Sequence, residues 1–319
     1  MKKAFSHALA VVLAALLLCG AVPLMAGAAD EIDITDKFTD PAFRAAVQEI
    51  IGKDEILDTD VAGIEALDVN SKSIRSLAGL EYFVGLTHLY CHGNQLTSLP
   101  ALPSGLNSLD CSSNPLRSLP ALPSSLRTLI CGHSRLSALP ALPAALINLE
   151  CSHSSLTALP ELPSGLERLL CHYNELTSLP ALSPALEFLW CASNRLTSLP
   201  ALPSGLTALW CEYNQLTSLD LTGLQLRSLD CTHNNMKDES AVIGFTGTWS
   251  TTEWTGGKST DGDEFYFAPQ NFWLDWPDWA QRILLFFVRP DISFLSTWPP
   301  FLQWILEYIL FGWLWMRWF

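Results

Sequence analysis

The sequence predicts an α/β solenoid in which short units stack so that their strands form one parallel sheet on the concave side. Three observations predict it. Cysteines recur every twenty residues from Cys91 to Cys231. Leucines stand five and two residues before each of these cysteines. The resulting L-x-C alternation has the period of two that a half-buried strand requires. A period this strict indicates one small supersecondary unit that is stacked many times.

The composition bounds the class of protein. The chain has 319 residues and a formal net charge of −14. An acidic chain of this kind lacks the basic face that phosphate binding needs, so no nucleic-acid partner is expected. Charged residues are only 16% of the chain and apolar residues 49%, which excludes a disordered protein.

Residues 1–28 have the features of an export signal. Lys2 and Lys3 precede an apolar core over residues 8–18, and a small-residue cleavage site lies at residues 26–28. Two alternatives stay open. Cys19 allows a lipid-anchored form, although the residue before it is not small, and the apolar core allows an uncleaved anchor, although it is short for a membrane span.

Residues 29–63 are expected to form a helical cap at the start of the solenoid. Asp40 is placed to accept hydrogen bonds at the N-terminus of a helix that begins at Pro41. Apolar residues follow at helical spacing and predict one buried face. They are Phe43, Val47, Ile50 and Ile51.

Residues 64–240 carry the repeats. Aligned on the cysteines, each unit reads L-x-x-L-x-C-x-x-N-x-L-x-x-L-P-x-L-P-x-x, with a longer degenerate unit at residues 64–85. The asparagine is expected to bond backbone groups where the strand turns, and Ser134 and Ser154 replace it in two units. The two prolines fix φ and predict an extended return on the convex side instead of a helix.

This unit resembles the leucine-rich repeat over about residues 64–236. The L-P-x-L-P spacing is similar to the short bacterial subtype found in secreted effectors, and the preceding segment resembles the cap of internalin-type surface proteins. The resemblance implies a curved solenoid that binds partners. Related effectors often carry a ubiquitin-ligase domain after the repeats, but this chain has too few and too hydrophobic residues there, so that activity is not transferred.

The periodic cysteines are expected to be core residues. Each stands where a core leucine or isoleucine would stand, and a free cysteine behaves as a small hydrophobe. Zinc binding is not supported, because the cysteines come singly and never as C-x-x-C pairs. Disulfides between neighbouring units are the alternative in an exported protein. Side chains that run parallel into a packed core are poorly placed for such bridges, so we expect free thiols.

An aromatic cluster on the outward face is the candidate ligand-binding site. Period-two alternation places large side chains from neighbouring units together, and exposed tryptophans and tyrosines are typical anchors of interfaces. The predicted ligand-binding residues are Leu170, His172, Tyr173, Phe188, Trp190, Trp210 and Tyr213. The alternatives are that the C-terminal segment buries this cluster or that the cluster has no role.

No metal, cofactor or catalytic site is predicted. His133 and His153 stand at equivalent positions of adjacent units, so a metal could bridge them, but no carboxylate is well placed beside them. The alternative to a metal site is that the histidines at this face are polar surface residues. The chain lacks H-E-x-x-H, G-x-S-x-G and a Walker loop, so we do not expect an enzyme.

After the repeats the composition changes twice. Residues 241–270 are rich in Thr, Gly and aromatics and are expected to form an irregular β segment that caps the solenoid. Residues 271–319 are strongly hydrophobic and predict two helices, near 277–288 and 299–318, in a membrane-associated tail. A helical cap packed on the repeats and a sorting or assembly signal are the alternatives for this tail.

Together these features predict an exported bacterial binding protein, extracellular or at the cell surface and membrane-associated through its tail. It would recognise a protein or glycan ligand through the concave face, without chemistry. The alternative is a secreted, non-catalytic effector that engages a host protein.

Overall fold

The computed structural model describes residues 31–247 and 264–266. The predicted export signal, most of the predicted β segment at 241–270 and the hydrophobic tail at 271–319 lie outside the described residues. Within the described part, no helix is long and apolar enough to cross a membrane.

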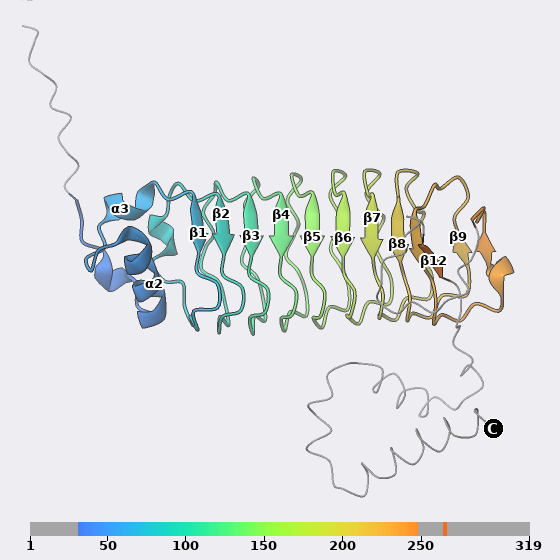
Figure 1. The fold of residues 1–319 in the computed structure, drawn as a ribbon, viewed down its shortest axis with the longest axis horizontal. Helices are drawn as coiled ribbons and strands as arrows, with labels where there is room; N and C mark the ends of the chain where they lie inside the picture. Colours follow the sequence, from blue (N-terminus) through green and yellow to red (C-terminus); the bar gives the residue numbers. More distant parts are fainter. Residues whose placement is uncertain (1–30, 248–263, 267–319) are drawn as a thin grey trace, which may run out of the picture.

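One parallel sheet of short strands runs through the described residues, with one strand from each unit (Figure 1). Equivalent leucines pair across successive strands, as Leu89 does with Leu109. The twenty-residue period therefore sets the register of the whole sheet. The strands, in sheet order, are β1 (Ala66–Asp68), β2 (His88–Tyr90), β3 (Ser108–Asp110), β4 (Thr128–Ile130), β5 (Asn148–Glu150), β6 (Arg168–Leu170), β7 (Phe188–Trp190), β8 (Ala208–Trp210), β10 (Ser228–Asp230) and β12 (Glu264–Tyr266).

The core lies between this sheet and the return segments. The middle residue of each strand from β1 to β10 is fully buried, and so is each cysteine that follows from β2 onward. The alternation confirms the inward placement of leucine and cysteine. All eight periodic cysteines are free thiols, as predicted.

Asparagine side chains form a ladder where the strands turn. Asn194 donates from Nδ2 to the carbonyls of Cys171 and Cys191, both at 3.0 Å, and its Oδ1 accepts from the Leu176 N–H at 3.0 Å. Each asparagine thus bonds its own unit and the preceding one, which confirms the predicted role. The ladder is interrupted at Ser134 and Ser154, whose hydroxyls lie 2.9 Å apart.

The N-terminal cap contains η1 (Thr35–Lys37), α2 (Pro41–Ile51) and α3 (Asp58–Ala62). Asp40 caps α2 as expected, because its Oδ1 accepts from the N–H groups of residues 42 and 43. Its Oδ2 accepts from the N–H groups of residues 75 and 76 and so joins the helix to the first repeat. Phe38, Phe43 and Phe83, which follows η2 (Leu80–Tyr82), form a buried aromatic cluster.

One part of the predicted helix face is wrong. Phe43 and Val47 are buried, and Ile51 packs at the edge of the core, but Ile50 is 46% exposed. Ala46 takes the buried position instead. A helix advances 100° per residue, so Ile50 and Ile51 cannot both point at a narrow contact with the repeats.

The return segments are extended through the two prolines of each unit, as expected. The last return departs from this pattern, since residues 219–226 contain no proline. This segment forms β9 (Leu219–Asp220), which pairs with β11 (Val242–Ile243) after η3 (Glu239–Ala241). Gly244 then passes so close to Thr222 that a Cβ would lie 2.6 Å from the Thr222 Cα.

Candidate binding face of the sheet

The solvent side of the sheet, which we call the sheet face, carries three columns of outward side chains. They lie three residues before, one residue before and one residue after each periodic cysteine. Neighbouring members of a column are held in register by the strand pairing, as Leu170, Trp190 and Trp210 are. Large side chains at equivalent positions are therefore brought into contact.

Four of the predicted binding residues form one continuous contact on the sheet face, which we call the aromatic patch. His172 stacks on Trp190, with ring centroids 3.8 Å apart and planes at 15°. Trp190 meets Trp210 edge to face at 4.9 Å, and Phe188 meets Trp210 in the same way at 5.2 Å. Both tryptophans remain half-buried, because each ring covers part of the next.

Leu170 and Tyr173 border this patch. Leu170 is half-buried on β6 and pairs in register with Trp190. Tyr173 meets His172 edge to face at 5.7 Å and stacks on His153 at 4.3 Å.

Tyr173 and Tyr213 do not lie on the strands. Both adopt left-handed backbone conformations, with φ of 53° and 55°, in the turn that follows each cysteine. Every unit from Ser113 to His233 has this conformation at the same position. Rings at this position stack along the turns, His133 on His153 and Tyr213 on His233. Ser193 stands between Tyr173 and Tyr213, so the structure places Tyr213 in a separate stack.

Burial controls the charge of His172. The residue is 7% exposed, and its buried Nδ1 has no hydrogen-bond partner. Burial, followed by the charges of His153 and His133, lowers the pKa of His172 to about 4. This imidazole is therefore neutral at pH 7 and acts as a flat apolar surface for Trp190.

Two acidic residues beside the patch were not predicted. Glu212 follows β8, Asp230 ends β10, and both are half-buried. Burial and then the charge of Asp230 raise the pKa of Glu212 to about 8, which the neighbouring Trp190 side chain partly opposes. Glu212 stands in the column after the cysteine, so extending the period-two reading by one residue would have found it.

Only one side of the patch contains a basic residue. The Arg168 guanidinium lies over the Phe188 ring, with Cζ 4.7 Å from the centroid. Trp210 Nε1 donates to Ser228 Oγ at 2.8 Å, which fixes its ring. The patch is thus a set of rigid rings with a cation at one side and two carboxyl groups at the other.

The comparison with protein families supports the repeat assignment. A family model described as leucine-rich repeats, two copies, matches residues 84–124. These residues contain β2 and β3 with their asparagine turns and proline-rich returns. The solenoid is a leucine-rich repeat fold. A comparison with curated proteins gave no match.

Solved leucine-rich repeat structures of bacteria resemble the chain in part. YopM, a leucine-rich effector protein from Yersinia pestis, has 27% identity over 60% of this chain and 56% of its own, with a TM-score of 0.47. The functional domain of InlJ from Listeria monocytogenes, described as including a cysteine ladder, has 26% identity over 65% and 58%, with a TM-score of 0.43. A Shigella effector leucine-rich repeat domain has 28% identity over 61% and 77%, also with 0.43. The chain spans just over half the length of the YopM and InlJ structures.

The leucine-rich repeats bring no metal site together among the described residues. His133 and His153 stack face to face at 4.1 Å, so the rings contact each other through their faces. No group of three or more His, Cys, Asp or Glu in residues 31–247 has the geometry to hold a metal ion. A leucine-rich repeat fold is typically a scaffold that binds proteins and performs no catalysis.

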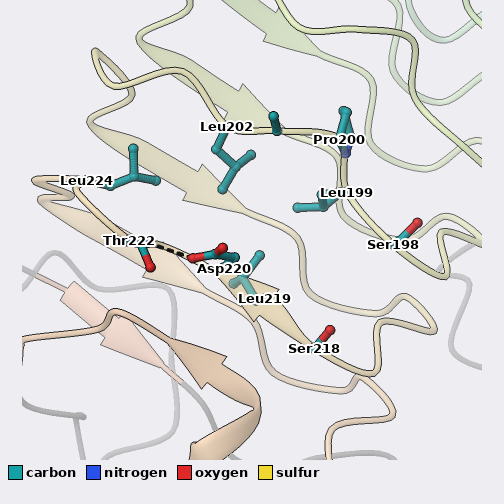
Figure 2. A pocket seen from close by; sticks show the side chains of 10 residues that line it. Ser198, Leu199, Pro200, Leu202, Ser218, Leu219, Asp220, Thr222 and Leu224 are labelled. Carbon is teal, nitrogen blue, oxygen red and sulfur yellow. Dashed lines mark hydrogen bonds between the residues drawn. The ribbon is translucent and has the colours of Figure 1, made fainter.

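A hollow of about 300 Å³ lies away from the sheet face, between the last two returns of the leucine-rich repeats (Figure 2). It forms because the proline-free return at residues 219–226 follows a different path from the regular return before it. Leu199 and Leu202 line one side, and Leu219 and Leu224 line the other. Thr222 and Asp220 are held together there by a hydrogen bond of 2.9 Å from N–H to Oδ1.

Proposed function

We propose that this chain is an exported bacterial leucine-rich repeat protein, displayed at the cell surface, that recognises a protein or glycan ligand through its sheet face. The aromatic patch carries the proposal. Trp190 and Trp210 present half-buried, interlocked rings on adjacent strands, and the buried ring of His172 stacks on Trp190, so little side-chain freedom is lost when a ligand binds. Tryptophan is also the side chain most enriched where binding energy concentrates.

Recognition without catalysis follows from the same residues. His172 has a pKa of about 4, so it is a weak base at pH 7. The periodic thiols are fully buried, with the pKa of Cys91 raised to about 12, so they do not serve as nucleophiles. The patch supplies shape, rings and fixed charges, and the mechanism is rigid display.

Export and membrane attachment rest on the sequence. The apolar segment after Lys2 and Lys3 supports secretion, and the hydrophobic residues 271–319 support attachment. The L-P-x-L-P spacing of the returns favours a second candidate, a secreted effector that engages a host protein, because it resembles the repeats of such effectors.

A binding screen tests the proposed sheet face. The full chain is applied to an array of extracellular protein domains and glycans, beside Trp190→Ala/Trp210→Ala, the patch variant. His88→Ala/Tyr90→Ala removes another aromatic pair of the same face, whose centroids are 6.3 Å apart, and serves as the matched control. We expect a ligand signal that the patch variant loses and the control keeps, with the same far-UV circular dichroism for all three. Equal signals for all three chains would exclude the patch as the binding site.

Fractionation separates display from release. The full chain and a version that ends at Gln270 are expressed in a bacterial host, and membranes are extracted with alkaline carbonate. Retention of the full chain alone in the pellet supports surface display. Appearance of the full chain in the medium supports the effector instead.

A further inference from the structure

We propose that the acidic end of the aromatic patch is a subsite for a cationic side chain, Arg or Lys, on a protein ligand. The subsite consists of Trp190, Trp210, Glu212 and Asp230. This inference rests on the proposed function, since it assumes that the patch binds a ligand. It adds the chemical group that the ligand presents and favours a protein over a glycan.

The first observation is a pair of carboxyl groups without a cation. Glu212 and Asp230 lie on neighbouring units and interact electrostatically, and both are half-buried. Among the described residues, no Lys or Arg forms an ion pair with either of them. Carboxyl groups removed from water are normally paired with a cation or bonded to donors, and in this pair a proton on Glu212 stands where a cation could bind.

The second observation is an unsatisfied oxygen. Glu212 Oε2 is buried and has no hydrogen-bond partner. Trp190 Nε1 is buried as well, and its hydrogen bond to the Glu212 side chain, which lowers the pKa of Glu212, is too poor in geometry to satisfy either atom. Asp230 differs, because its Oδ1 accepts from the N–H and the hydroxyl of Thr232 at 3.0 and 2.8 Å. Glu212 is therefore the member of the pair with the weaker set of donors.

The surrounding rings favour a cation over another donor. Trp190 and Trp210 stand beside the carboxyl groups, and an indole face attracts ammonium and guanidinium groups. The same patch already contains such a contact, Arg168 over Phe188. An arriving cation would thus meet aromatic faces together with two acidic groups.

The charge of the whole sheet face points the same way. In its three outward columns, carboxylates outnumber guanidinium groups, and the guanidinium is engaged with Phe188. The acidic members are Asp68, Asp110, Glu150, Glu212 and Asp230, and the basic member is Arg168. A cationic segment of a ligand would therefore be attracted along the face toward the buried pair.

The elevated pKa of Glu212, about 8, supports this reading. Without a ligand, the pair avoids two adjacent charges by keeping a proton. A bound cation would remove the repulsion from Asp230 and favour the ionised form of Glu212.

The test uses the full chain labelled with 5-fluorotryptophan and observed by ¹⁹F NMR. Trp→Phe variants assign the lines of Trp190 and Trp210. The probe is N-acetyl-L-arginine amide, the lysine analogue is a second probe, and N-acetyl-L-citrulline amide is the neutral isostere. We expect saturable shifts of both lines with the cationic probes, and affinity for the citrulline compound at least about tenfold weaker.

Variants locate the subsite. Glu212→Gln should lower the affinity for the arginine probe at least about tenfold. Asp230→Asn provides a second test if the first variant misfolds. Glu150→Gln, on the same face but away from the patch, should leave the affinity unchanged. The proposal would be overturned if the citrulline compound bound as well as the arginine probe, or if both acidic variants kept their affinity. Shifts of the two lines with CaCl₂ but not with the arginine probe would also overturn it. Loss of array binding in the patch variant together with full binding by Glu212→Gln would refute the subsite and leave the proposed function standing.

Discussion

The chemistry of the patch is decided by a few buried ionisable side chains. His172 is held neutral by burial and by two neighbouring histidines, so it stacks on Trp190 as an uncharged ring. Glu212 is held protonated by burial and by Asp230. Both shifts remove charge from the centre of the sheet face, where an uncompensated ion would be expensive to bury.

Glu212 should make stability depend on pH in a defined direction. Its pKa is raised from 4.5 to about 8, so between these values the native state holds a proton that the unfolded state has released. The contribution of Glu212 to stability is therefore fully present below pH 4.5 and is lost as the pH rises toward 8. Urea denaturation at pH 5.5 and pH 8 measures how much the free energy of unfolding falls between these values. In Glu212→Gln this fall should be smaller than in the wild type by on the order of 1–3 kcal/mol.

Glu150→Gln is the control for that measurement, because Glu150 occupies an outward position on β5. Its pH profile should match that of the wild type. An unchanged decline in Glu212→Gln would show that the carboxyl of Glu212 is ionised throughout this range.

For single residues, the sequence predicts whether a side chain points inward or outward better than it predicts the structure around that side chain. Period two correctly separated the inward Leu89 and Cys91 from their outward neighbours. It could not reveal that the residue two after each cysteine has positive φ, because the serines and tyrosines at this position rarely adopt that conformation. The sequence therefore predicts Tyr173 and Tyr213 on the outward face together with the strand residues, whereas the structure has them in the turns that follow the strands.

Among the elements, the asparagine turns explain how units without helices hold together. Each side chain joins two successive units through at least four hydrogen bonds, as Asn114 does by donating to the carbonyls of Cys91, Cys111 and Ser112 and accepting from the Leu96 N–H. The residue type was sufficient to predict this, because only an amide offers donors and an acceptor on so short a side chain.

The pairing of β9 with β11 depends on Gly244. This glycine has φ of 76°, and a Cβ would collide with the Thr222 backbone at 2.6 Å. Gly244→Ala should destabilise the end of the solenoid by about 2–4 kcal/mol, through both strain and collision. Thermal unfolding monitored by circular dichroism measures the change.

Gly223→Ala is the matched control. Gly223 also has positive φ, 81°, but a Cβ there would meet no atom within 4 Å. Gly223→Ala should lower the free energy of unfolding by only about 1 kcal/mol, because alanine is strained at positive φ but meets no neighbouring atom there. Equal losses in the two variants would show that the close approach of Gly244 to Thr222 does not matter.

The cysteine column should be inert in the folded protein. Its eight thiols are fully buried, and burial raises their pKa values. Iodoacetamide should leave them unmodified under native conditions and modify all eight after unfolding in guanidinium chloride without reductant, as counted by intact mass. Rapid native modification would contradict their core position, and resistance after unfolding would indicate disulfides.

At the scale of the whole molecule, the repeat makes a long rigid surface from one small unit. Its period was enough to predict the parallel sheet, the core and the extended returns. It could not predict the proline-free return or the pairing of β12 with β10, because both occur where the repetition ends. The candidate site could be predicted only in part for a similar reason. Glu212 and Asp230 influence each other because both are partly buried on neighbouring units, and burial cannot be read from the aligned repeats.

Rigidity and charge define how the molecule would engage a partner. The strands hold Trp190 and Trp210 in fixed positions, and the net charge of −14 favours a basic partner. A ligand bound as proposed would cover the aromatic patch. Hydroxyl-radical footprinting tests it most directly, because tryptophan, tyrosine and histidine side chains report their own solvent exposure.

The measurement compares the free full chain with its complex with a ligand captured in the array screen. Oxidation is quantified by mass spectrometry at each aromatic side chain of the sheet face. We expect oxidation of Trp190, Trp210 and Tyr173 to fall several-fold in the complex, while that of His88 and Tyr90 stays the same. Protection confined to the N-terminal cap or to the return segments, with the patch still oxidised, would contradict it.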